Sequence, residues 1–246
     1  MHRRHTLAAL ALVLGTATTG LAATGLAGAG PAAAAGGTEV TAGTVDAFSM
    51  GTETTKTFTV RATVTGADTA SFMLQSASTA CWRLFETGDL TADGGGAFSG
   101  TFTLAQRDRD NACAGHALLA VYASDSSGSG WDDEEFVVDF KRASVFSGQN
   151  FGPEPVRSGG TVTGTATLKR ASWDDNAYHG VPAPPVLAQF RTATGQYATV
   201  KTVTGDSAGK VTAAATQKVD GCWRFSFAGY STTTASTPAG DCVDSY

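Results

Sequence analysis

The chain has 246 residues, with 17 lysines and arginines against 22 aspartates and glutamates, and a formal net charge of -5. Loss of residues 1–35 would remove Arg3 and Arg4 but no acid, leaving 15 basic and 22 acidic residues and a net charge of -7. A nucleic-acid-binding protein usually carries a basic patch, so this acidic balance argues against a nucleic-acid partner.

The first residues predict a cleaved signal peptide. Met1 to His5 are basic, Leu7 to Leu14 form a short apolar run, and small residues lead to Ala33–Ala35. This pattern places cleavage after Ala35. The apolar run is much shorter than the ~20 residues that a spanning helix needs. We therefore expect a secreted, extracellular protein without a membrane span.

Apolar and polar residues alternate along the rest of the chain, which predicts an all-β protein. Residues 36–56 are rich in Gly and Thr and are expected to be a flexible N-terminal arm or a first strand. A first domain is expected over residues 57–142. Its predicted strands are Thr57–Val64, Ser71–Gln75, Trp82–Thr87, Ala97–Leu104, His116–Ala123 and Phe136–Phe140.

A second domain is expected over residues 143–246. Its predicted strands are Ser144–Phe151, Thr161–Leu168, Val186–Arg191, Tyr197–Val203, Lys210–Thr216, Trp223–Phe227 and Cys242–Ser245. Laying the two halves over each other places Cys113 on Cys222, which indicates a weak tandem repeat. Together these patterns predict two tandem β-sandwich domains after the signal peptide.

All four cysteines lie after the signal peptide, and an even number in an exported protein predicts structural disulfides. Three connectivities are possible. We prefer Cys81 with Cys113 and Cys222 with Cys242, because each bridge then stays inside one domain. Each should contribute ~3 kcal/mol by closing its loop in the unfolded chain. In the first domain the bridge is expected to join the strand that matches Trp223–Phe227 to the one that Trp82 opens.

Several blocks in the second half occur in the order found in a known family. They are Pro153–Val156, Leu168–Asp174, Gln189–Arg191, Tyr197–Val203, Gly221–Gly229 and Gly240–Asp244. With them, residues 144–246 resemble the immunoglobulin-like repeat of secreted actinobacterial proteins of the Streptomyces type. The resemblance implies an immunoglobulin-like β-sandwich and little about function. Many relatives have another residue where Cys222 and Cys242 stand, so this disulfide departs from the pattern.

Two histidines follow the signal peptide. His116 opens an apolar strand and is expected at the core or at a strand edge, and His179 lies in a predicted loop. Neither has a serine elbow or a cysteine nucleophile near it in sequence, and no pair of His or Cys has zinc-ligand spacing. We therefore expect no enzyme activity and assign no catalytic residue. A hidden hydrolase site is the remaining alternative.

Two acidic segments each follow a tryptophan. Asp132, Asp133 and Glu134 follow Trp131, and Asp174 and Asp175 follow Trp173. Clustered loop carboxylates are typical ligands of calcium, although the spacing is not that of an EF-hand. Solvated acidic loops are expected here, with a calcium site as the alternative and no other cofactor.

The tryptophans divide into two groups. Trp82 and Trp223 stand beside cysteines and are expected to pack in the core. Trp131 and Trp173 stand beside acids, and with His179 they are the candidates for an exposed recognition surface. Their alternative role is to cap the ends of the sandwiches.

These features favour a secreted, non-enzymatic binding or scaffold protein. Its partner would be an extracellular protein or a cell-envelope component, bound through sandwich loops or edge strands. One alternative is an inhibitor of an extracellular hydrolase that inserts loop 230–238 or loop 179–185 into a cleft. Another is a calcium-binding extracellular module.

Overall fold

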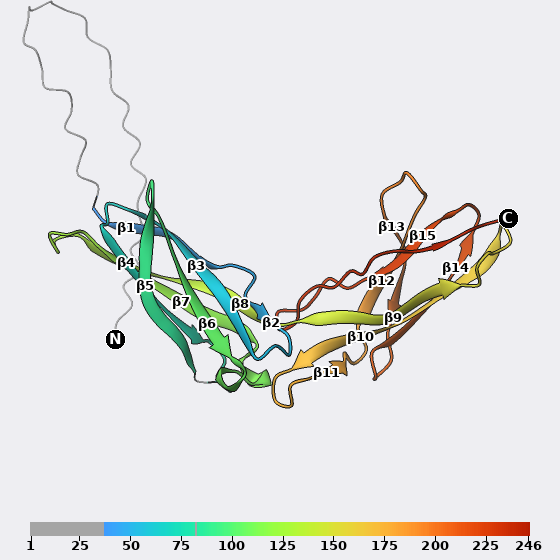
Figure 1. Ribbon diagram of the computed structural model, residues 1–246, viewed down its shortest axis with the longest axis horizontal. Helices are drawn as coiled ribbons and strands as arrows, with labels where there is room; N and C mark the ends of the chain where they lie inside the picture. The colour runs from blue at the N-terminus through green and yellow to red at the C-terminus, as the bar shows by residue number, and fades with distance from the viewer. Residues whose placement is uncertain (1–36, 82) are drawn as a thin grey trace, which may run out of the picture. The chain divides into compact units, whose positions relative to one another are not determined.

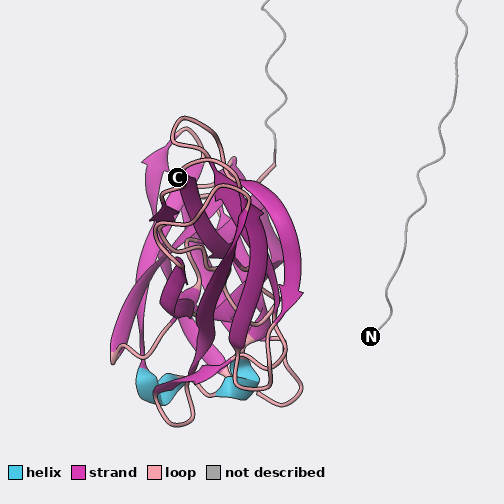
Figure 2. Ribbon diagram, turned by 90° about the vertical axis from the view of Figure 1, so that its right-hand side faces the viewer, coloured by secondary structure: helices cyan, strands magenta, loops and turns pink. Residues whose placement is uncertain are grey.

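The computed structural model describes residues 37–81 and 83–246 (Figure 1), which belong to one compact unit. The predicted signal peptide, residues 1–35, and Trp82 lie outside the described residues. Strands dominate the fold, with two 3-10 helices, η1 (Gln106–Asp108) and η2 (Asn111–Cys113) (Figure 2). The prediction of an all-β protein is therefore confirmed. Among the described helices, none is long and apolar enough to cross a membrane.

Eight strands form the first group, in the order β1-β3-β6-β5-β4-β7-β8-β2. Their bounds are β1 Glu39–Val45, β2 Ser49–Met50, β3 Thr55–Thr65, β4 Thr69–Ser76, β5 Leu84–Gly94, β6 Ala97–Ala105, β7 Gly115–Ser124 and β8 Trp131–Arg142. All neighbours are antiparallel except β2 and β8, which are parallel.

Strand β5 divides this group into two layers. Its first part, Leu84–Leu90, pairs with β4, and the part after it, Thr91–Gly94, pairs with β6. The alternation on each strand directs apolar side chains between the layers, where Phe72 of β4 and Phe102 of β6 have ring centroids 5.9 Å apart. The group is therefore a sandwich with one shared core.

The second group has two four-stranded sheets. One contains β9 Ser144–Gly152, β10 Gly160–Ser172, β11 Ala177–Gly180 and β14 Lys210–Gln217, and the other contains β12 Pro185–Arg191, β13 Ala198–Thr204, β15 Gly221–Ser226 and β16 Asp241–Val243. Buried Phe151 and Leu168 of the first sheet share a core with Trp223 and Phe225 of the second. Trp223 is thus a core residue, as predicted, and its indole Nε1 donates to Gln217 Oε1 at 2.8 Å.

Every predicted strand overlaps a strand of the structure. The differences concern segments that were expected to be loops or a flexible arm. Within residues 37–56, β1 pairs with β3 and buries Val40 and Val45, so this part is a first strand rather than an arm. The acidic segment after Trp131 was expected in a loop but belongs to β8. His179 was also expected in a loop and lies on β11.

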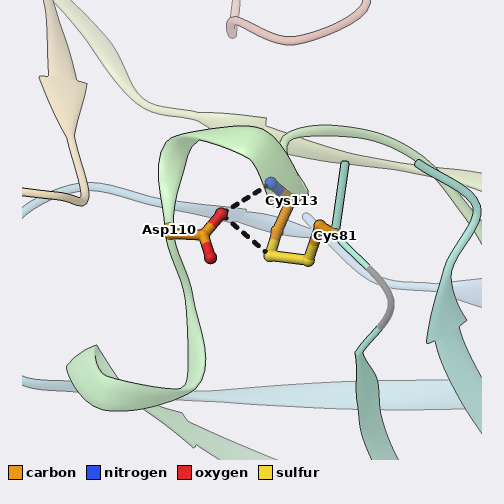
Figure 3. Close-up of side chains that lie close together, drawn as sticks. All are labelled: Cys81, Asp110 and Cys113. Atoms are coloured by element: carbon orange, nitrogen blue, oxygen red, sulfur yellow. Dashed lines mark hydrogen bonds between the residues drawn. A yellow bond between two sulfur atoms is a disulfide. The ribbon is translucent and has the colours of Figure 1, made fainter. Parts of the chain in front are cut away.

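Both expected disulfides are present, Cys81–Cys113 and Cys222–Cys242. The second joins β15 to β16. The first does not join two strands, because Cys81 lies before β5 and Cys113 lies in η2 (Figure 3). Asp110 caps this short helix by accepting from the Cys113 N–H at 3.1 Å. The expected equivalence of Cys113 and Cys222 is therefore wrong at the level of secondary structure.

Candidate binding face

The outward face of β5, β4, β7 and β8 carries exposed apolar and acidic side chains. Directly paired residues of antiparallel strands project to the same side of a sheet. The register places Trp131 opposite Ser124 and Asp133 opposite Tyr122. We call this surface the outer face and define it by Ser71, Met73, Gln75, Leu84, Thr87, Asp89, Leu118, Tyr122, Trp131, Asp133, Glu135 and Val137.

Four large apolar side chains of the outer face are open to solvent. Trp131 is 71% exposed, Val137 64%, Leu84 56% and Tyr122 40%. Their strands alternate, so the opposite side chains of β8, such as Phe140, fill the core. Sheet geometry therefore leaves these four side chains without cover among the described residues.

The outer face is also hollowed. A cavity of about 310 Å³ is lined by residues that include Ser71, Asp89, Tyr122 and Trp131. A second one, of about 370 Å³, shares the first three of these residues and adds Met73. Because the two cavities share their walls, they form one shallow groove across β5, β4 and β7, with carboxylate and aromatic groups at its rim.

The loop before Trp131 is held by Asp125. Its carboxylate accepts from Ser127 Oγ at 2.8 Å, from the Gly130 N–H at 2.9 Å and from the Ser129 N–H at 3.1 Å. The Ser127 hydrogen bond, with help from the backbone groups, lowers the pKa of Asp125 despite a smaller opposing effect of burial. Trp131 therefore leaves a fixed turn, which preorganises its position.

Trp173 does not belong to an exposed recognition surface. Its side chain is 2% exposed, and its ring stacks on Phe140 with centroids 4.5 Å apart. The indole Nε1 donates to Met50 O at 3.2 Å. The expectation of exposure fails because β10 delivers this side chain into the core of the first group, where it becomes a packing residue.

The predicted carboxylate ligands are not brought together. Asp132, Asp133 and Glu134 are consecutive on β8, so their side chains alternate between the two sides of the strand. Asp132 Oδ2 accepts from the Val40 N–H at 2.8 Å. Asp174 accepts from Asn111 N and Nδ2 at 2.8 and 2.7 Å. The first acidic segment therefore lies on a strand, and Asp132 and Asp174 accept hydrogen bonds within the protein.

Each of the two histidines has an aspartate partner. Asp175 Oδ2 lies 2.6 Å from His179 Nε2, and Asp139 Oδ1 lies 2.8 Å from His116 Nδ1. Both histidines are exposed. His116 and Asp139 lie on β7 and β8 beyond the groove, so the structure brings neither histidine into it.

One cluster of metal-ligand type occurs among the described residues, namely Cys81, Asp110 and Cys113 (Figure 3). Its two sulfur atoms are bonded to each other. A metal site that used these two cysteines as ligands would need their thiolates, and a disulfide offers none. With the disulfide formed, the cluster is a turn that the disulfide and the Asp110 hydrogen bond stabilise.

Sequence reasoning found Trp131 but missed the rest of the outer face. Tyr122 belongs to the apolar segment 116–123, which forms most of β7. This strand is central, between β4 and β8, yet one side of the sheet has no covering layer in the described chain. Strand pairing alone brings the exposed Leu84 and Val137 onto this face, in one row with Gln75 and Leu118.

No family model matches the sequence, and no curated protein matches it. Solved structures with a similar arrangement include the D0-D1 domain of intimin, with 15% identity, a TM-score of 0.30, and coverage of 84% of this chain and 98% of that chain. A DUF4785 family protein from Legionella pneumophila has 12% identity and a TM-score of 0.40 over 78% of this chain and 53% of its own. Latent PorU from Porphyromonas gingivalis has 11% identity and a TM-score of 0.32 over 87% of this chain and 20% of its own. These likenesses concern the β-strand arrangement and carry no argument about function.

Proposed function

We propose that this chain is a secreted, non-enzymatic binding module that engages a protein partner through its outer face. The observation that carries the proposal is Trp131, 71% exposed on a fixed strand next to Tyr122. Exposed aromatic side chains on a rigid surface are typical anchors of protein interfaces. The two disulfides support the proposed export, because structural disulfides are typical of proteins in oxidising environments.

The charges of the outer face favour a basic partner surface. Asp89, Asp133 and Glu135 project from its central part, whereas Arg83 lies at one end, beside Gln75, Leu84 and Leu118. Opposite charges steer a partner to the surface and select against acidic competitors. The aliphatic Leu84 and Val137 favour a polypeptide over a sugar, because a sugar stacks on aromatic rings and gains little from exposed aliphatic groups.

The loops that an inhibitor would use are fixed to the protein itself. In loop 230–238, Thr233 is buried and Thr234 O accepts from Ser144 Oγ at 2.7 Å. In loop 179–185, Val181 and Pro184 are buried. Both segments still expose residues, among them Tyr230 and Pro182. The proposal therefore rests on the four exposed apolar side chains of the outer face and not on these loops.

Selection of a displayed random-peptide library on the exported chain, with both disulfides intact, tests this proposal. We expect enrichment of peptides that combine Lys or Arg with aromatic or aliphatic residues. Titration of such a peptide should show that Trp131→Ala weakens binding by about tenfold or more, the usual effect of removing an aromatic anchor. Glu135→Lys should weaken it too, and more strongly at low salt.

Two exposed valines give a matched control. Val137→Lys on β8 should weaken peptide binding, whereas Val200→Lys on β13 should leave it unchanged, because Val200 lies in the second group. Equal affinity of the Trp131→Ala variant would refute the role of the outer face. Retention of neutral oligosaccharides, lost in Trp131→Ala, would replace the protein partner with a carbohydrate.

A further inference from the structure

A second polar site lies apart from the outer face, where β8 ends beside β10. It is a cavity of about 240 Å³ whose polar lining residues are Asn111, Arg142, Arg170, Ser172 and His179. Arg142 is the last residue of β8, and Arg170 pairs with His179 across β10 and β11. Two arginine residues therefore line one small space.

Arg142 is a buried cation without a bound partner. The residue is only 9% exposed and its Nε is fully buried. Within residues 37–81 and 83–246, no acceptor forms a hydrogen bond with its guanidinium and no carboxylate forms an ion pair with it. Its backbone is nevertheless fixed, because its N–H donates to Thr232 O at 3.1 Å and its carbonyl accepts from the Thr234 N–H at 3.0 Å.

The positive charge of Arg170 makes the burial of the charged Arg142 side chain less favourable. The side chain of Arg170 makes one hydrogen bond among the described residues, from Nη1 to Thr233 Oγ1 at 3.5 Å. Burial, and after it the charge of Arg170, lower the pKa of Arg142 to about 10, against a smaller opposing effect of Asp174. Two neighbouring cations in a desolvated site favour the arrival of a negative charge.

The acids around the cavity are already engaged. Asp174 accepts two hydrogen bonds from Asn111, and Asp175 is bonded to His179. Neither forms an ion pair with Arg142 or Arg170 in the described chain. The planar guanidinium group offers parallel N–H donors that match the oxygen atoms of a carboxylate, sulfate or phosphate.

We propose that this cavity binds an oxyanion, meaning a carboxylate, sulfate or phosphate group, with Arg142 and Arg170 as its charged donors. The ligand would supply the acceptors and the negative charge that the described residues do not give Arg142. The site is independent of the outer face, since they share no defining residue. Binding here would also tie β8 of the first group to β10 of the second.

Calorimetric titration of the exported chain tests the site, with sulfate, inorganic phosphate and acetate as separate probes at an ionic strength held constant with chloride. At least one probe should show saturable binding at one site per chain, and the ranking distinguishes the three sources. Arg170→Gln should weaken it by about tenfold or more, because a charge-assisted hydrogen bond is lost. Arg157→Gln is the matched control, since Arg157 is exposed and outside the cavity.

A second measurement avoids changing the buried Arg142. The NMR signal of its Nε–H in the unaltered protein should shift during the titration, with the same midpoint as the calorimetric curve. Trp131→Ala should leave both curves unchanged, which separates this site from the proposed protein-binding function. Absence of saturation with all three probes, or equal affinity of the Arg170→Gln variant, overturns the proposal.

Discussion

The ring of Trp173 stacks on the ring of Phe140 with a centroid separation of 4.5 Å and an interplanar angle of 29°. Phe140 belongs to β8 of the first group, whereas Trp173 directly follows β10 of the second. The two sandwiches therefore share core packing at this point. Asn111 holds the same corner, since its Oδ1 accepts from the Trp173 N–H at 2.8 Å.

Replacing Trp173 should destabilise the fold strongly. Trp173→Ala removes a buried aromatic ring and leaves a cavity, so we expect the free energy of unfolding to fall by about 3–5 kcal/mol. Urea unfolding followed by circular dichroism measures it. Trp131→Ala is the matched control and should change this free energy by about 0.5 kcal/mol or less, because its side chain is exposed. Similar losses in both variants would contradict the structure.

Asn111 should contribute to the stability of the fold through its hydrogen bonds to Trp173 and Asp174. Asn111→Ala removes the acceptor for the Trp173 N–H and one donor to Asp174, so we expect a loss of about 1–3 kcal/mol in the free energy of unfolding. Asn150→Ala is the control, because Asn150 is exposed. The expectation is wrong if the two variants unfold at the same urea concentration.

Asp139 should add stability that depends on pH. Partial burial is the largest single effect and raises its pKa. The hydrogen bonds and charges from Lys141 and His116 together outweigh this effect, so the pKa of Asp139 is below its ordinary value. A lowered pKa in the folded state stabilises the protein above the unfolded pKa, about 3.9, and this stability is lost as the pH falls through the folded value.

Unfolding of the parent protein and of Asp139→Asn across the acidic range tests this dependence. At pH 7 the parent should be more stable by about 0.2–1 kcal/mol, the usual magnitude for a solvent-screened pair. The difference should shrink below about pH 4. A difference that stays constant down to pH 2 would show that the carboxylate charge is not the cause.

The Cys222–Cys242 bridge closes a loop with a sequence separation of 20. Replacing both residues by Ser should lower the free energy of unfolding by about 3 kcal/mol, through the greater freedom of the unfolded chain. The Cys81 and Cys113 double variant, with a separation of 32, should lose about the same or slightly more, because the effect grows only with the logarithm of loop length. Losses below about 1 kcal/mol would contradict this account.

Local patterns were sufficient to predict much of the fold. Alternation along β3 directs Phe58, Val60 and Val64 to the core, and each is buried. The predicted pairing of four cysteines was also right, since nearby pairs within one domain were the simplest choice. These features depend on residues that are close together in the sequence, so the sequence alone is sufficient to predict them.

The candidate sites depend on contacts that sequence does not encode locally. Tyr122 and Asp133 meet on the outer face through the register of β7 and β8. Arg142 and Arg170 line one cavity although 28 positions separate them in the chain. No motif marks either pair, because side chains of distant strands converge only after the sheets pack.

Two tryptophans show where the division lies. Trp131-Asp132-Asp133 and Trp173-Asp174-Asp175 are the same three residue types in the same order, so sequence assigned both tryptophans to an exposed surface. The sequence by itself determined the alternation of core strands such as β3 and the pairing of the cysteines, but it placed the acidic segments after both tryptophans in loops. Only the tertiary structure decided that Trp131 is 71% exposed and Trp173 is 2% exposed. The physical reason is that Phe140 and Met50 cover Trp173, whereas the described sheet leaves the outer face of β8 open.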